Sequence, residues 1–210
     1  MYALHMLMAA VALATLVAAA YSETVHRYEQ NCETGEVTQI PVSAGDELPL
    51  TTFSTLHMGK IKLVRSPRLF ARKRVLLFSV AAAYEPGADV QFKDMVRQVY
   101  HNYDDLGLDA IVMVMASDPF ANNAFTRHHH EAPHPEVWTT VSDANGVFAR
   151  GAGLVCPHFE EGAKSGLHLF AAVVNNNVIE WITVDHGHQH VNSRPEMVVD
   201  YLRSHPRPAL

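Results

Sequence analysis

Thiols and imidazoles are the side chains of this 210-residue chain that could do redox or metal chemistry. The two cysteines are Cys32 and Cys156. They do not form a Cys-x-x-Cys motif, and the chain has no second pair of cysteines to complete a zinc site. They could form a disulfide in an oxidising compartment, although two separate thiols is the simpler interpretation. His158 stands close to Cys156 and could favour its thiolate, so Cys156 is a candidate redox residue as well as a candidate structural one.

The 14 histidines include two clusters. In the first, His186, His188 and His190 alternate with other residues, so an extended segment would place three imidazoles on one side, as a Zn²⁺ or Cu²⁺ site requires. A polar surface loop and a pH-sensitive contact with a partner are the alternatives. The second cluster, residues 128–130 with His134, falls at a predicted helix end. Successive residues of a helix point about 100° apart, so the three in a row cannot share one metal, whereas His130 and His134 could if the turn beyond the helix allowed it.

Composition limits the remaining classes of function. The chain is 48% hydrophobic and 9% aromatic, which is typical of a globular protein with one sizeable core. Its formal net charge of -6 provides no broad basic surface for a phosphate backbone, so we expect no binding to nucleic acid.

An uncharged stretch covers residues 4–21 and is rich in Ala, Leu, Met and Val. Its length fits a secretory signal that ends in small residues, or a membrane anchor of just under the roughly 20 residues that span a bilayer. A helix buried against a partner subunit is a third possibility. No Lys or Arg precedes the stretch, which is unusual for a mitochondrial presequence. We therefore expect residues 1–22 to be a signal peptide or membrane anchor, and residues 23–44 an extended lead-in.

The elements that would position the candidate residues follow from periodicity. Residues 75–80 form an apolar run typical of a strand buried on both faces, and an amphipathic helix follows, with apolar positions from Phe92 to Leu106 and an end near Gly107. Residues 109–116 form a second buried run, and Ser117-Asp118-Pro119 then opens another helix. The order strand, helix, strand, helix predicts a right-handed βαβ unit.

The second half of the chain predicts a ββα unit. A strand over residues 137–141, a turn at 143–146 and a short helix over 147–152 precede two β-prone runs, 167–174 and 178–184, joined by Asn175-Asn176-Asn177. A closing helix begins at Pro195 and ends near Ser204. The fold class is therefore α/β, a thioredoxin fold with a mixed central sheet and helices on both faces.

From about Gly45 to Leu202 the chain resembles the redoxin domain of the type-5 peroxiredoxins, so we expect a redoxin domain over residues 45–205. The likeness rests on motifs that occur in the family's order: Gly45-Asp46-Glu47-Leu48-Pro49, Leu76-Leu77-Phe78-Ser79-Val80, Ser117-Asp118-Pro119-Phe120, the segment Ser142 to Phe148, and a hairpin over 170–179. The resemblance implies a peroxiredoxin fold and, in an intact member, a thiol that reduces peroxide.

The residues that carry this chemistry in the family are replaced here. The family's active-site loop reads Pro-Gly-Ala-Phe-Thr-Pro-x-Cys, and against it the proline falls on Ala81, the threonine on Glu85 and the peroxidatic cysteine on Ala88. The family's arginine falls on Leu169. A methyl group cannot replace the thiolate that attacks peroxide, so the resemblance implies a pseudoenzyme.

Three functions are consistent with these observations. The first is a catalytically inactive, peroxiredoxin-like accessory subunit, with protein partners in a complex or homodimer and a membrane contact through residues 4–21. The second is a thiol-dependent redox enzyme or sensor that uses Cys156, alone or with Cys32. The third is a metal-binding protein that uses His186, His188 and His190, with no other cofactor expected. We expect the chain at an organellar membrane, such as that of the mitochondrion, or in the secretory pathway.

Overall fold

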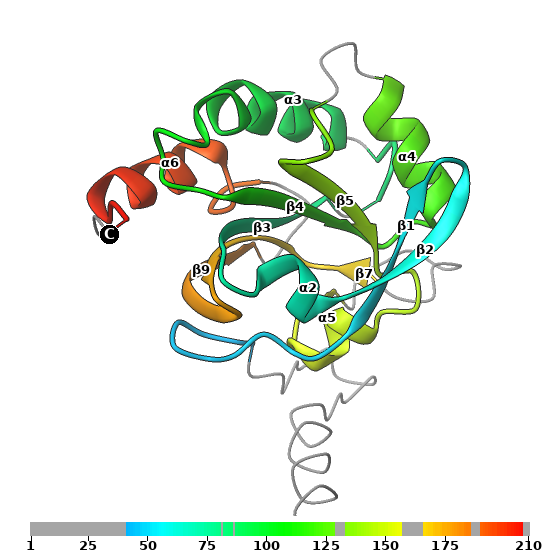
Figure 1. Ribbon diagram of the computed structural model, residues 1–210, viewed down its shortest axis with the longest axis horizontal. Coiled ribbons are helices and arrows are strands. Elements are labelled where there is room, and N and C mark those ends of the chain that lie inside the picture. The colour runs from blue at the N-terminus through cyan, green and yellow to red at the C-terminus, as the bar shows by residue number, and fades with distance from the viewer. Residues whose placement is uncertain are drawn as a thin grey trace, which may run out of the picture.

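Strand β3 (Arg74–Val80) lies at the centre of the protein, and all seven of its residues are buried. The computed structural model describes residues 41–80, 82–85, 87–128, 133–156, 166–185 and 190–207. Seven strands form one sheet in the order β2-β1-β5-β4-β3-β8-β9 (Figure 1). The other strands of this sheet are β1 (Thr52–His57), β2 (Lys60–Arg65), β4 (Ala110–Met115), β5 (Trp138–Ser142), β8 (Leu169–Asn175) and β9 (Val178–Asp185).

The sheet is mixed. Strands β3, β4 and β5 run parallel, while β8 is antiparallel to β3 and β9 antiparallel to β8. At the other edge, β1 pairs with β2 over six residue pairs and meets β5 at Ser54 and Ser142. A separate two-stranded sheet pairs β6 (Val155–Cys156) with β7 (Gly166–Leu167). A parallel βαβ core extended by antiparallel strands agrees with the predicted fold class.

Helices cover both faces of the sheet because the strand side chains alternate (Figure 1). Leu76, Phe78 and Val80 point into the core beneath α3 (Ala88–Gln98), α4 (Pro119–His128) and α6 (Pro195–Ser204). Val75 and Leu77 point into the opposite core, with α2 (Ser66–Phe70) and α5 (Val147–Gly151). The predicted arrangement of a mixed sheet between two helical layers is confirmed.

Two local predictions are wrong. The helix predicted to end near Gly107 ends at Gln98, and the chain then tightens into a short 3-10 helix, η1 (Tyr100–Asn102), so Leu106 is buried by a turn instead. A small hairpin is predicted within residues 23–74 from turn signals at 33–35 and 44–46, but the β1–β2 hairpin turns at Met58-Gly59 instead. The closing helix, in contrast, has the predicted bounds, Pro195–Ser204.

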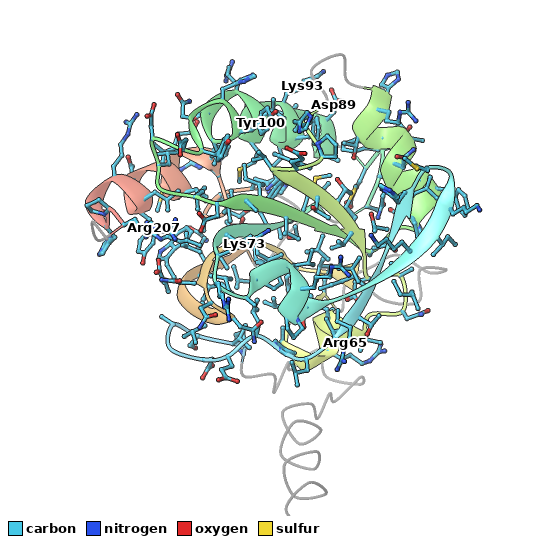
Figure 2. All side chains as sticks on the ribbon, viewed as in Figure 1. Arg65, Lys73, Asp89, Lys93, Tyr100 and Arg207 are labelled. Atoms are coloured by element: carbon cyan, nitrogen blue, oxygen red, sulfur yellow. The ribbon has the colours of Figure 1, made fainter. Side chains whose placement is uncertain are left out.

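Charged side chains hold the segment that follows α6 against the sheet. Arg74 is buried, and its Nε donates to Glu180 Oε2 at 2.8 Å while its second guanidinium nitrogen donates to the carbonyl of His205 at 2.8 Å. Arg207 donates to Asp109 at 2.7 Å, and in Figure 2 Arg207 lies beside α6. These contacts hold α6 against β3 and β9.

The N-terminal predictions fall outside the described part of the chain. Residues 4–21 and most of the expected lead-in, 23–44, are not described, and only residues 41–44 of that lead-in are. Within the described ranges, no helix is both long enough and apolar enough to cross a membrane.

Candidate functional site

The candidate site is the loop that joins β3 to α3. It turns sharply, because Tyr84 has φ 65° and Gly87 has φ 93°, both in the left-handed region. Glu85 N–H donates to the carbonyl of Ala82 at 3.4 Å, and Ala88 N–H donates to the carbonyl of Glu85 at 3.0 Å. Glu85 and Ala88 therefore belong to one tight turn that delivers the chain into α3. Ala81 lies outside the described residues.

The end of β4 holds this loop in place. Ala83 N–H donates to Ser117 Oγ at 2.7 Å, while the carbonyl of Ser117 accepts from Ser142 Oγ at 2.5 Å and from Asn122 Nδ2 at 3.2 Å. Since Ser117 follows β4 and Ser142 ends β5, the parallel strands bring these residues to the edge of the sheet where β3 also ends. The carboxyl ends of parallel strands are the common place for a site in such a sheet.

Aromatic rings form one wall of the site. Tyr84 is 61% exposed, and its ring meets Phe125 of α4 edge-on at 5.5 Å. Phe125 in turn meets Phe92 of α3 at 5.5 Å, and Phe92 meets Trp138 of β5 at 5.4 Å. This chain of rings packs α3 and α4 together over the sheet and fixes the position of the first turn of α3.

The first turn of α3 begins with Ala88, whose side chain is 3% exposed. Gly87 provides no side-chain cap, and Asp89 is paired with Lys93 at 2.6 Å. Gln91 is also 3% exposed, and neither polar atom of its amide has a hydrogen-bond partner among the described residues. The first turn of α3 therefore contains a buried amide without a partner among the described residues, and it starts with a residue whose side chain is only a methyl group.

Leu169 lies at the same end of β3 as this loop. Ser79 Oγ donates to the carbonyl of His168 and accepts from Phe170 N–H, both at 2.8 Å, so it clamps β8 on either side of Leu169. Leu169 is 4% exposed. The topology therefore brings together three of the predicted positions, Glu85, Ala88 and Leu169, and they hold a carboxylate, a methyl group and an isobutyl group.

Cys156 lies in β6 and is buried. Its pairing partner is Gly166, and Leu154 beside it accepts a hydrogen bond from His168 N–H at 2.9 Å. This small sheet leads directly into β8, so Cys156 lies on the segment next to the strand that carries Leu169. Cys32 lies outside the described residues, so the possible pairing of the two cysteines stays a prediction.

The predicted metal site is only partly within the described residues. His186 and His188 lie outside them, and His190 follows the gap. Within the described ranges, no group of three or more His, Cys, Asp or Glu residues could hold a metal ion. Of the other cluster, His128 ends α4 and His134 is exposed, 4.0 Å from a carboxylate oxygen of Glu136. Zinc or copper binding therefore stays a prediction.

His190 belongs instead to a buried polar network that the sequence did not indicate. Asp185 is 2% exposed and accepts from Ser193 Oγ at 2.6 Å and from the amides of Asn192 and Ser193 at 2.6 and 3.0 Å. Burial opposes ionisation of Asp185, but these hydrogen bonds together bring its pKa below the ordinary value.

The same network sets the tautomer of His190. Ser193 has one hydroxyl proton and gives it to Asp185, so Nδ1 of His190, at 3.0 Å from Ser193 Oγ, must carry its own proton. Burial lowers the pKa of His190 to about 4, although the charge of Asp185 acts in the opposite direction. We conclude that this imidazole is neutral in the folded chain at neutral pH. Its contact with Ser193 holds the segment that leads into α6.

Comparisons with known proteins agree on one family. The sequence profile of the family described as Redoxin matches residues 43–198. The chain is 26% identical over 163 residues to Peroxiredoxin-2C of Oryza sativa, a match that covers 77% of this chain and 99% of that protein. It is also 26% identical over 141 residues to hybrid peroxiredoxin hyPrx5 of Haemophilus influenzae, where the match covers 67% of this chain but only 57% of the relative.

Solved structures show the same fold. Reduced Prx3 of Vibrio vulnificus in complex with hydrogen peroxide superposes with a TM-score of 0.69 at 22% identity, covering 77% of this chain and 99% of that one. The 1-Cys peroxiredoxin of Plasmodium falciparum also gives a TM-score of 0.69, at 14% identity. At these identities the likeness concerns the fold alone.

Proposed function

The chain belongs to the redoxin family, and we propose that it is a catalytically inactive member that serves as an accessory or structural subunit of a larger assembly. The observation that carries this proposal is Ala88. It begins α3, directly after the loop from β3, where the resemblance to the type-5 peroxiredoxins implies the peroxidatic thiol. Peroxide reduction in such a site requires a thiolate, and a methyl group cannot provide one.

The surroundings of Ala88 support the proposal independently. Glu85 shares a turn with Ala88, and its carboxylate would repel a thiolate, whereas a threonine hydroxyl would hydrogen-bond to one. Leu169 is buried at the start of β8, beside the end of β3, where the resemblance implies an arginine that would compensate the negative charge. As the chain is aligned to the family by resemblance, three separate positions lack the groups that the chemistry needs, which supports the proposal.

The contacts that shape the candidate site support a role in an assembly. The aromatic wall of Tyr84, Phe125 and Phe92 and the Ser117 contact preserve the shape of the site without its chemistry. A fold retained in this way can present surfaces to protein partners, either other chains or a second copy. We place the assembly at an organellar or secretory membrane, through residues 4–21, on the composition of that stretch.

The test is the native size of the endogenous protein after extraction in a mild detergent. We expect the chain to migrate on a native gel with a larger complex, whose other subunits mass spectrometry of the band would identify. Migration as a free monomer or dimer would contradict the accessory role.

A second candidate function is thiol-dependent peroxide reduction or sensing through Cys156. It is favoured by the position of Cys156 in β6, on the segment that leads into β8 beside the candidate site. It is also favoured by the relatives, which are named peroxiredoxins. The burial of Cys156 counts against it, because reactive cysteines are usually accessible. A peroxidase activity that disappears in Cys156→Ser would establish this function.

A further inference from the structure

Positive charge is concentrated in one part of the chain. From Leu48 to Tyr84 the sequence contains seven of the 16 lysines and arginines and no aspartate or glutamate, although the whole chain has a net charge of -6. Five of the seven are exposed on or next to β2 and α2: Lys60, Lys62, Arg65, Arg68 and Arg72. None of these five side chains takes part in the ion pairs formed among the described residues.

Some cations elsewhere on the surface lie in ion pairs. Lys93 is matched by Asp89 and Arg97 by Asp94, all on α3. In Figure 2, Arg65 lies at the opposite end of the molecule from Asp89 and Lys93. The β1–β2 hairpin and α2, whose places Figure 1 shows, therefore form a basic rim whose five exposed cations have no ion-pair partner among the described residues, while the whole chain has a net charge of -6.

The same rim exposes large apolar side chains. Met58 at the hairpin tip is 89% exposed, and Ile61 and Leu63 on β2 are 54% and 70% exposed. Ile61, Leu63 and Arg65 share one face of the strand and Lys60 and Lys62 the other, so a bilayer that receives the hairpin tip would meet both faces; β2 is an edge of the seven-stranded sheet. Lysines are a common protection of an edge strand against unwanted pairing, but that role does not explain the exposed apolar residues between them.

The tip of the hairpin is built at a conformational cost. Met58 and Gly59 form the two-residue turn with φ 49° and 75°, both in the left-handed region. Such turns favour Asn-Gly or Asp-Gly, because a residue with a longer side chain is disfavoured at positive φ. Met58 has this disfavoured backbone conformation, and its apolar side chain is exposed. Backbone strain of this kind is typical of functional positions.

We propose that the β1–β2 hairpin binds the surface of an anionic lipid bilayer, with Met58 inserted among the lipids. Ile61 and Leu63 lie along the interface, and Lys60, Lys62 and Arg65 meet the negatively charged headgroups. Interfacial binding of this kind combines buried apolar area with attraction of basic residues to anionic lipid. The inference does not depend on the proposed function, since it holds whether or not the chain reduces peroxide.

A bilayer fits this surface better than an acidic peptide does. A peptide that extended the sheet would pair with the backbone of β2, and Met58 lies beyond the end of that strand. A bilayer contacts the tip, the strand and the flanking cations together. The hairpin would also act separately from residues 4–21, so the test must report on the hairpin itself.

The experiment is limited oxidation of methionine in the full-length chain, followed by peptide mass spectrometry. The oxidant is chloramine-T, and the chain is mixed with vesicles of phosphatidylcholine, with or without phosphatidylserine. We expect the oxidation of Met58 to slow several-fold with phosphatidylserine vesicles and much less with phosphatidylcholine alone. Met197 on α6, which is 40% exposed, is the internal control, and its rate should not change.

A charge variant with a matched control completes the test. Lys60→Gln with Lys62→Gln should weaken the binding of the hairpin roughly 30-fold and abolish the protection of Met58, because each cation near an anionic surface contributes about fivefold. Lys93→Gln with Arg203→Gln removes two exposed charges on α3 and α6, away from the hairpin, and should leave the protection intact. Circular dichroism would show that both variants are folded.

Three results would overturn the proposal. Met58 could be oxidised at one rate with and without vesicles, or equally protected by neutral and anionic vesicles. A soluble polyglutamate peptide could protect Met58 where vesicles do not, which would assign the hairpin to an acidic protein partner.

Discussion

Replacing Ala88 with cysteine tests whether the family chemistry is lost beyond the thiol itself. The variant is made with Cys32→Ser and Cys156→Ser, so that the new thiol alone reacts. Ala88 is 3% exposed, and its N–H donates to the carbonyl of Glu85 at 3.0 Å, which places the Glu85 carboxylate in the same turn. The new sulfur would therefore ionise beside a negative charge.

The size of this effect follows from the geometry. Glu85 and Ala88 are the two ends of an i to i+3 turn, and the Cα atoms at the ends of such a turn are less than about 7 Å apart. At about 6 Å and an effective dielectric constant near 20, one negative charge disfavours a thiolate by roughly 3 kcal/mol, or about 2 pKa units. The N-terminus of α3 opposes this by about 1 unit or less. We expect the thiol pKa to lie at or above its ordinary value of about 8.5, so only a few per cent is thiolate at neutral pH.

The assay is the pH dependence of alkylation by monobromobimane. Ala124→Cys, on the exposed side of α4, provides the ordinary thiol for comparison, and Ala88→Cys should react no faster at neutral pH. Adding Glu85→Thr should lower the pKa and raise the rate about tenfold. A pKa well below 7 in Ala88→Cys alone would refute the reasoning, because Glu85 and Leu169 would then not disable the site.

Further predictions concern stability, measured by urea unfolding. Glu180→Gln leaves the buried guanidinium of Arg74 without its carboxylate and should lower the free energy of unfolding by roughly 3 kcal/mol. Lys93→Gln breaks an exposed pair and should lower it by less than about 0.5 kcal/mol. Equal losses in the two variants would contradict the assigned burial of the Arg74 pair. The pKa of His190 is about 4 in the folded chain, against an ordinary value of 6.5. Between these two pH values the unfolded chain therefore binds a proton that the folded chain does not, and the free energy of unfolding should fall by roughly 1–3 kcal/mol as the pH drops from 6.5 to 4. His190→Gln should flatten that profile, and an unchanged slope would contradict the assignment. Asp143→Ala removes the acceptor for two amides of α5 and should cost about 1–2 kcal/mol, with Asp143→Asn milder; a neutral alanine variant would refute the capping role.

Where the sequence predicted elements well, the cause is local. The buried runs of β3 and β4 are short and continuously apolar, and Pro195 opens α6 at the first helical position. Asp118 precedes α4 and accepts from the amides of Phe120 and Ala121 at 2.8 and 3.1 Å, as the Ser117-Asp118-Pro119 motif predicted. Each of these signals lies within a few residues of the element that it specifies.

The features that the sequence did not predict depend on an uncommon turn or on residues far apart in the chain. The β1–β2 hairpin turns at Met58-Gly59 in place of a common turn pair, so no turn signal marked it. Arg74 and Glu180 are separated by 106 positions, and no local pattern joins them. The Asp185 network likewise uses backbone amides of residues 191–193, which leave no trace in side-chain type.

The candidate site was predicted through family resemblance. Glu85, Ala88 and Leu169 were aligned to the family's chemical positions by motif order, and the structure brings all three to the same end of β3. The buried and unpartnered amide of Gln91 was not predicted, because a glutamine in an amphipathic helix is ordinarily exposed.

The most direct test of the central claim is peroxide consumption by the purified full-length chain with an excess of dithiol reductant. Consumption is followed with time for the wild type and for Cys32→Ser with Cys156→Ser. We predict that both consume hydrogen peroxide at the same background rate, since Ala88 supplies no thiolate at the start of α3. Repeated turnover by the wild type that is lost in the cysteine variant would contradict the claim and assign the activity to the remaining thiols.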